Sequence, residues 1–250
     1  MNLALAIVAF PPALALGSFL NVVAARLPEG RSLVHPASNC RSCGTEVAWR
    51  DNVPLLSFLL LRGRCRSCGE RIGARYFVVE LLTGLLVGAC FLRFGPSAEA
   101  FLSAFFVSVL VVLSAIDFER RILPDKIVLP SAALVFAAHL VLAPGRWPEW
   151  TFAPLGAALF LFVALLVHPR GMGMGDVKLC LLLGAMLGKL VLVGLMTGML
   201  AALLPAVYLL GRHGAAARKM AIPFGPFLAF GALVALFWGD ALLDAYLGAF

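Results

Sequence analysis

Charged residues are scarce in this sequence of 250 residues, at 13% of the total, and hydrophobic residues make up 62%. A soluble domain has about half apolar and about a quarter charged residues, so this composition excludes an ordinary soluble protein. The alternation of polar and apolar residues that is typical of membrane β-barrels is also missing. The sequence therefore predicts an all-α polytopic membrane protein.

Several common motifs are missing as well. No basic residue precedes Arg26, although a signal peptide begins with a basic region, so we expect residues 2–25 to persist as a first transmembrane helix. The patterns G-x-S-x-G, H-E-x-x-H and the P-loop do not occur, and neither does a glycine-rich nucleotide fingerprint. The net charge of +7 could suit nucleic acid, but the basic residues follow the loops of a membrane topology, and we expect no nucleic-acid partner.

What the sequence does contain is a series of long apolar stretches. They cover residues 2–25, 76–92, 100–116, 127–144, 150–167, 177–211 and 222–250. Most are near the ~20 residues that span a bilayer, but the stretch at 177–211 is too long for one pass. Lys189, which follows Gly188, indicates a tight turn there, so we predict about eight transmembrane helices, with seven as the alternative.

The distribution of basic residues decides between these two topologies. With residues 26–75 placed in the cytoplasm, 17 of the 20 Lys and Arg residues lie inside, and only Arg93, Arg146 and Lys189 lie outside. A seven-helix chain has a weaker asymmetry, because basic residues near the C-terminus move outside. The positive-inside rule therefore favours eight helices.

Four cysteines form two identical boxes in the polar segment. Cys40-Arg41-Ser42-Cys43-Gly44 is repeated as Cys65-Arg66-Ser67-Cys68-Gly69, with 21 residues between the two pairs. Two C-x2-C boxes supply four thiolates to one tetrahedral zinc ion, and such a closed site is structural. Iron is an open alternative to zinc, whereas two disulfides are disfavoured in a reducing cytoplasm.

Two aspartates stand at the ends of hydrophobic runs. They are Asp117 and Asp176, and the predicted topology places both at the cytoplasmic edge of the membrane. An acid at this depth costs energy unless it faces a partner or a wet cavity, so it is a functional candidate. Because two carboxyls that share one proton are the minimum for aspartyl proteolysis, the pair predicts an intramembrane aspartic protease.

Five further residues are candidates for support of this site. Gly173 and Gly175 give a flexible approach to the second aspartate, which could alternatively be only a helix cap. Lys178 is expected to pair with an acid or with lipid phosphate. We interpret Asp125 as the N-cap of the next helix, and Glu80 either pairs with a nearby arginine or lines the site.

Together these motifs resemble the type IV prepilin peptidases, also called prepilin leader peptidase/N-methyltransferases, which are GxGD-type intramembrane aspartic proteases. Besides the cysteine boxes and the segment Asp117 to Asp125, the matching motifs are Gly17-Ser18-Phe19-Leu20-Asn21, Asp51-Asn52-Val53-Pro54, Arg75-Tyr76-Phe77-Val78-Val79-Glu80, Gly173-Met174-Gly175-Asp176 and Ile222-Pro223-Phe224-Gly225-Pro226-Phe227. The match covers nearly the whole chain, and the ordered set is far more specific than any one motif.

The resemblance implies a bifunctional enzyme of the bacterial cytoplasmic (inner) membrane, with its active site at the cytoplasmic face. It implies removal of the basic leader from type IV prepilins or pseudopilins by Asp117 and Asp176, and methylation of the new N-terminal residue with S-adenosylmethionine. The expected partners are the substrate helices and membrane lipid; the residues that bind the methyl donor are not located. The expected parts are a first transmembrane helix at 1–25, a cytoplasmic four-cysteine metal-binding domain at 26–75 and a multi-helix membrane peptidase domain at 76–250.

Two alternatives stay open at this point. Membrane-edge acids and glycine breaks also occur in ion-coupled transporters, although no inverted repeat of broken helices and no charge at mid-membrane is visible. The second alternative is a peptidase without methyltransferase activity.

Overall fold

The computed structural model describes residues 2–167, 172–214 and 222–248, in which helices and short 3-10 turns are joined by loops and no strand is present. The chain divides into two compact units, Met1–Ala115 and Ile116–Phe250. Each unit is described by itself.

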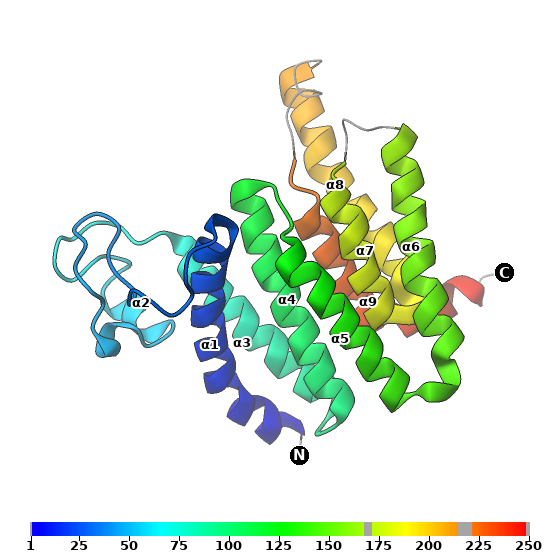
Figure 1. The fold of residues 1–250 in the computed structure, drawn as a ribbon, viewed down its shortest axis with the longest axis horizontal. Helices are drawn as coiled ribbons and strands as arrows, with labels where there is room; N and C mark the ends of the chain where they lie inside the picture. The colour runs from blue at the N-terminus through cyan, green and yellow to red at the C-terminus, as the bar shows by residue number, and fades with distance from the viewer. Residues whose placement is uncertain (1, 168–171, 215–221, 249–250) are drawn as a thin grey trace. The chain divides into compact units, whose positions relative to one another are not determined.

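The first unit contains a pair of long helices, α1 (Asn2–Arg26) and α3 (Ala74–Phe94), which pack along each other (Figure 1). Their approach is close because Gly17 faces α3: a Cβ at this position would lie 2.7 Å from the Cα of Glu80. Small residues allow such contacts between membrane helices. The helix α4 (Ala98–Arg120) begins in this unit.

Residues 27–73, which we call the cysteine segment, connect α1 to α3. The segment has little regular structure, and its elements are η1 (Leu27–Glu29), η2 (Trp49–Asp51) and the one-turn helix α2 (Leu56–Leu60). A segment of this size with few buried apolar side chains needs another source of stability, such as a metal.

The second unit begins with the last turn of α4 and contains five more long helices. They are α5 (Asp125–Leu142), α6 (Trp147–Val167), α7 (Met174–Leu187), α8 (Val191–His213) and α9 (Gly225–Leu247), with the short turns η3 (Pro144–Arg146) and η4 (Gly188–Leu190). At its centre is α7, which packs against α5, α6 and α9 and buries ten of its 14 residues (Figure 1).

The long stretch that we predicted to turn near Lys189 is broken there. Gly188 has a positive φ of 54°, and from this point α7 and α8 run in opposite directions (Figure 1). The described residues contain seven candidate membrane spans, and the one that joins α7, η4 and α8 is 40 residues long. The predicted all-helical fold is confirmed, and α7 is short, at about 21 Å against the ~30 Å of a bilayer core.

Glycines also bring helices together in the second unit. Gly184 of α7 lies against the backbone of Pro154 in α6, and Gly231 of α9 lies against Gly194 and Gly198 of α8, with no room for a Cβ at Gly184 or Gly231. Such small-residue contacts fix the position of α7 and α9, and the first turns of these two helices form the site described next.

Candidate active site and metal site

Asp117 lies in the last turn of α4 and is buried, with 5% of its surface exposed. Its Oδ2 atom accepts a hydrogen bond of 3.0 Å from the backbone N–H of Gly225, the first residue of α9. A Cβ at position 225 would lie 2.8 Å from this oxygen. Only glycine therefore lets the start of α9 approach the carboxyl so closely.

Asp176 is the third residue of α7 and is 8% exposed. Its Oδ2 atom accepts a 3.0 Å hydrogen bond from the backbone N–H of Gly173, while its own N–H donates to the Gly173 carbonyl at 3.1 Å. This reciprocal pair fixes the carboxyl at the start of the helix, where the helix dipole favours negative charge. Asp176 thus caps its own helix and is also available for chemistry.

The structure brings the two carboxyls into one unit, close enough for the charge of Asp117 to act on Asp176. The loops beside them also meet: a Cβ at Gly175 would lie 3.0 Å from the Cβ of Leu123. Two buried carboxyls that interact in this way do not both ionise readily, so they can hold one proton between them. That is the arrangement needed for acid–base catalysis on a water.

Lys178 and Asp125 form an ion pair beside this site. The Lys178 Nζ atom lies 2.8 and 2.7 Å from the two carboxylate oxygens of Asp125, which joins α7 to the start of α5. Our interpretation of Asp125 as an N-cap was wrong: Pro124 is the N-cap residue and Asp125 follows it as the first helical residue. We expected Lys178 to pair with an acid or with lipid phosphate, and in the structure it pairs with the acid Asp125.

Glu80 lies in the first unit, in the second turn of α3. Its Oε2 atom accepts a 2.8 Å hydrogen bond from the backbone N–H of Leu55, and its side chain is also hydrogen-bonded to the side chain of Ser18 in α1. The carboxylate therefore attaches the cysteine segment to both long helices of this unit. Its predicted place in the lining of the active site stays a prediction.

The four cysteines of the repeated boxes come together in space. Their sulfur atoms lie within 4.8 Å of one another, and none is in a disulfide. Each box is a tight turn: Gly44 and Gly69 adopt positive φ and donate their N–H to the carbonyls of Cys40 and Cys65, both at 2.9 Å. Four sulfur donors at this spacing fit a tetrahedral metal such as zinc.

The pKa values of the cysteines in the boxes shift in opposite directions: desolvation and hydrogen bonds with the other thiols raise the pKa of Cys68 to about 12. Hydrogen bonds with Thr45 lower the pKa of the Cys43 thiol to about 6. A metal binds the thiolate and not the thiol, so this cysteine is ready to bind at neutral pH.

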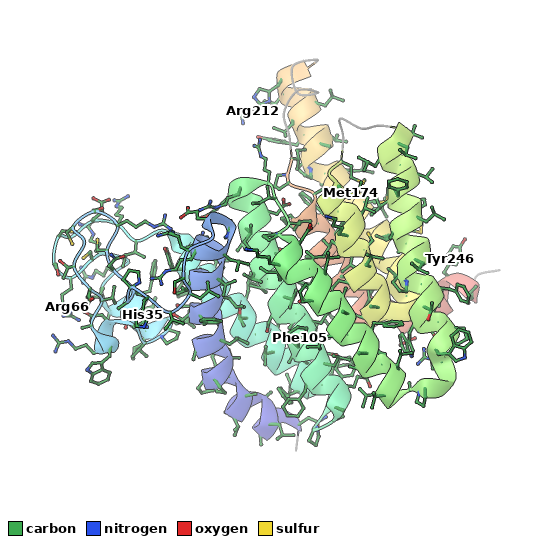
Figure 2. All side chains as sticks on the ribbon, in the orientation of Figure 1. His35, Arg66, Phe105, Met174, Arg212 and Tyr246 are labelled. Atoms are coloured by element: carbon green, nitrogen blue, oxygen red, sulfur yellow. The ribbon has the colours of Figure 1, made fainter. Side chains whose placement is uncertain are left out.

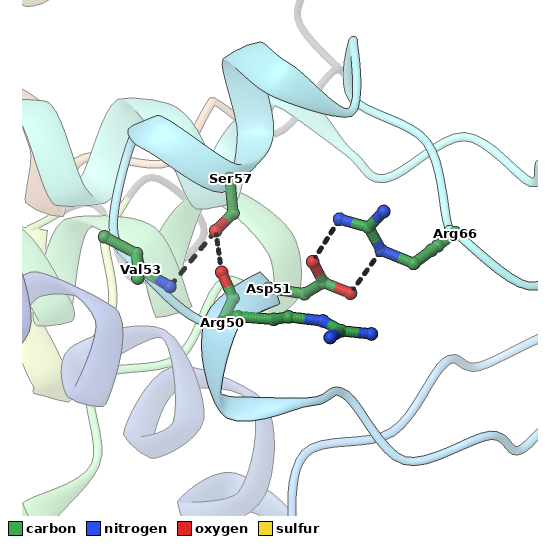
Figure 3. A network of polar contacts seen from close by, with 5 residues as sticks. All are labelled: Arg50, Asp51, Val53, Ser57 and Arg66. Carbon is green, nitrogen blue, oxygen red and sulfur yellow. Dashed lines mark hydrogen bonds and ion pairs between the residues drawn. The ribbon is translucent and has the colours of Figure 1, made fainter.

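A polar network joins the second box to the Asp51-Asn52-Val53-Pro54 motif (Figure 3). Arg66, which lies in the cysteine segment (Figure 2), donates from Nε and Nη2 to the two carboxylate oxygens of Asp51 at 2.8 and 2.6 Å. These bonds hold the pKa of Asp51 below its usual value. The Ser57 hydroxyl donates to the Arg50 carbonyl at 3.0 Å and accepts the Val53 N–H at 3.2 Å.

Sequence reasoning missed the part of Gly225. The motif Ile222-Pro223-Phe224-Gly225-Pro226-Phe227 contributes to the family resemblance, but the sequence predicts no role for its glycine. The signal was present, because a proline just inside a helix marks its first turn and a glycine beside it permits a close backbone approach.

The fold and the site define a polytopic helical membrane protein with two neighbouring carboxyls buried at helix ends. Comparison with known families agrees: the Bacterial Peptidase A24 N-terminal domain matches residues 12–94, and the Type IV leader peptidase family matches residues 104–249. The chain belongs to the type IV leader peptidase family, as the resemblance predicted.

Several relatives of this chain carry the name "Prepilin leader peptidase/N-methyltransferase". The protein of Aeromonas hydrophila is 36% identical over 94% of this chain and 91% of its own length, and that of Bacillus subtilis is 31% identical over 94% of each. The protein of Myxococcus xanthus is 41% identical over 76% of this chain and 58% of its own length. No solved structure matches. Bacterial relatives and seven apolar spans make this a multi-pass protein of the bacterial cytoplasmic membrane.

Proposed function

We propose that this enzyme removes the basic leader from type IV prepilins or pseudopilins, with Asp117 and Asp176 as the catalytic pair. Family membership supports the reaction, and one observation carries the assignment of the residues. Both carboxyls are buried in the same unit, and each has its Oδ2 held by a backbone N–H at the start of a helix. A buried acid pair held in this way serves chemistry better than folding, since burial of either acid costs free energy.

The proposed mechanism uses one proton shared by the pair. The ionised carboxyl takes a proton from a water molecule as this water attacks the scissile carbonyl, and the protonated carboxyl donates its proton to the developing oxyanion. As the tetrahedral intermediate collapses, the C–N bond breaks and the pair returns a proton to the leaving amine. Since Gly225 and Gly173 occupy the Oδ2 atoms, we assign the Oδ1 atoms to water and substrate.

We place this reaction at the cytoplasmic face. The loops after α4, α6 and α8 carry the basic residues that the positive-inside rule assigns to the cytoplasm. Asp117 precedes the first of these loops, and Asp176 follows the second. A substrate helix that lies in the bilayer would present its leader at this side.

We also propose methylation of the new N-terminal amine with S-adenosylmethionine, on the basis of the names of the relatives. The sulfonium of this donor supplies an activated methyl group. The buried polar side chains of the first unit include Glu80, which binds the Leu55 N–H, and Asn21, whose Oδ1 atom lacks a hydrogen-bond partner among the described residues. One such oxygen does not define a nucleoside site, so we derive no step through the donor.

The metal has a structural task in this proposal. Cys40, Cys43, Cys65 and Cys68 would hold zinc, which cross-links the two boxes of the cysteine segment and supplies no step of the cleavage.

The proposed function is tested by the intact mass of a prepilin coexpressed with wild-type enzyme, Asp117→Asn or Asp176→Asn. We expect wild type to remove the leader and add one methyl group, and each variant to leave the prepilin uncleaved. Asp240→Asn, the same change at an exposed position of α9, is the matched control and should behave as wild type. Cleavage at the wild-type level by either active-site variant would overturn the pair, and cleavage without the methyl group would show a peptidase alone.

A further inference from the structure

The cysteine segment presents an apolar surface around α2. Leu56, Leu59 and Leu60 are all exposed, and Leu60 has 73% of its surface uncovered. Trp49 and Val53, which precede the helix, are exposed as well. Because these apolar side chains are exposed, they would not stabilise the segment if it were surrounded by water. An exposed apolar patch of this kind marks a contact with a membrane or a partner.

The depth of this surface follows from α3. Leu55 donates its N–H to Glu80, which lies six residues after the first residue of α3, Ala74. At roughly 1.5 Å per residue this is about 9 Å along the helix axis. Because the 21 residues of α3 are just long enough to cross a ~30 Å hydrocarbon core, a point this far from the end of the helix lies below the headgroups.

The backbone around α2 is satisfied in the way that such a depth demands. Non-helical backbone is tolerated in a membrane only where protein groups bind its N–H and C=O atoms. The Leu55 N–H, in a residue with a positive φ of 59°, is bound by the Glu80 carboxylate. The Val53 N–H and the Arg50 carbonyl are both bound by the Ser57 hydroxyl (Figure 3). Binding of the Leu55 N–H explains why α3 contains the acid Glu80.

Charge at the two ends of the surface fits lipid headgroups. Arg50 lies before it and Arg62 and Arg64 lie after it, and all three are exposed. Arginines at this position attract the phosphates of anionic lipids. They would repel the basic leader of a prepilin, so the surface suits a lipid leaflet better than a substrate.

We infer that residues 53–60 are a re-entrant membrane anchor. Leu56, Leu59 and Leu60 insert among the acyl chains of the leaflet in which α1 ends and α3 begins, and the flanking arginines bind anionic headgroups. The cysteine segment is then attached to the bilayer surface and is not a domain surrounded by water. This inference depends on the membrane topology and not on the proposed catalytic pair.

A photo-crosslinking amino acid at position 60 tests the anchor. The full chain is reconstituted in nanodiscs of phosphatidylethanolamine and phosphatidylglycerol, with zinc bound, and irradiated with and without a prepilin. Val34 is the matched control position, because it belongs to the same segment and is equally exposed, at 73%. The same amino acid is also placed at position 59 in a second variant, so that the test does not depend on the crosslinker at position 60 alone.

We expect phospholipid adducts at positions 60 and 59, several-fold more abundant than at position 34 and unchanged by prepilin. Adducts with prepilin in place of lipid would overturn the anchor and make the surface a substrate contact. Equal lipid adducts at positions 34 and 60, or no lipid adducts at all in variants that still bind zinc, would also overturn it.

Discussion

At the scale of single residues, three glycines near the aspartates have three different tasks. Gly173 donates the hydrogen bond that holds Asp176, and Gly175 leaves room for Leu123. Gly225 does both for Asp117, since its N–H binds the carboxyl and its missing Cβ makes the approach possible. The flexibility that the sequence predicted at Gly173 and Gly175 stays a prediction; the structure shows a close approach that a Cβ would hinder at Gly175 and Gly225.

Gly225→Ala should therefore impair cleavage without unfolding the protein. The added methyl would displace the Asp117 carboxyl, and misplacement of a reacting group by about 1 Å can lower kcat on the order of 10²-fold. We expect such a fall in kcat with KM near the wild-type value, measured on a purified prepilin. The matched control is Gly156→Ala in α6, where a Cβ meets nothing within 4 Å.

A rise in KM with kcat unchanged would contradict this task for Gly225, because it would place the residue in substrate binding. Equal loss of activity in Gly156→Ala would point to a general effect of alanine in these helices.

Other side chains show where sequence reasoning stops at this scale. The sequence alone identified Asp117, Asp176 and the four cysteines as candidate site residues. Acids at a membrane edge and paired C-x2-C boxes seldom occur in a protein unless they have a function. The partners of Glu80 and Asp125 could not be identified in this way, since Leu55 lies 25 residues from Glu80, and Lys178 lies 53 residues from Asp125. Contacts over such distances depend on tertiary packing that local pattern does not record.

At the scale of elements, the two cysteine boxes should fold only around their metal. Cys65→Ser removes one of four ligands, and we expect the variant to lose most of the roughly one zinc ion per chain that a four-ligand site binds. Zinc content by mass spectrometry, together with limited proteolysis of residues 27–73, measures both the loss and the unfolding of the cysteine segment.

Ser42→Ala is the control, because it lies in the first box and is not a ligand. Full zinc content in Cys65→Ser would exclude the four-cysteine site, and iron in the purified wild type would identify the other metal.

The pair α8 and α9 depends on its glycine contacts. Gly231→Ala forces these two helices apart, because a Cβ there meets the backbone of Gly194 and Gly198. Overpacking of this kind costs about 1–3 kcal/mol, so we expect a lower Tm in detergent than for wild type. Since α9 carries Gly225, some activity should be lost as well. Gly211→Ala, where a Cβ would meet nothing within 4 Å, should leave Tm unchanged; equal Tm values for the two variants would contradict the packing argument.

Helix positions were the most predictable elements. Hydrophobic runs located the long helices to within a few residues, and Gly188 with Lys189 located the break between α7 and α8. The short helix α2 was not predicted, because five residues, four of them apolar, inside a polar segment have no distinguishable period.

At the scale of the whole molecule, the number of crossings decides where the active site faces. Helix α7 is short for a bilayer, so composition alone allows the 40 residues from Met174 to His213 to count as one span. The positive φ of Gly188 and the opposite directions of α7 and α8 argue for two (Figure 1). With two, the loop after α8 returns to the side of the loops after α4 and α6, and this is the side that carries most of the positive charge.

Reporter fusions measure this directly. Alkaline phosphatase is active only outside the cytoplasm and green fluorescent protein folds only inside it. Eight crossings predict phosphatase activity after Lys189 and fluorescence after His213, because α8 carries the chain back across the membrane. Fluorescence after Lys189 together with phosphatase activity after His213 would mean that α7 does not cross. The N–H of Gly225, which follows His213 in the chain, could then not be on the same side as Asp117, and the hydrogen bond that positions this aspartate would be excluded.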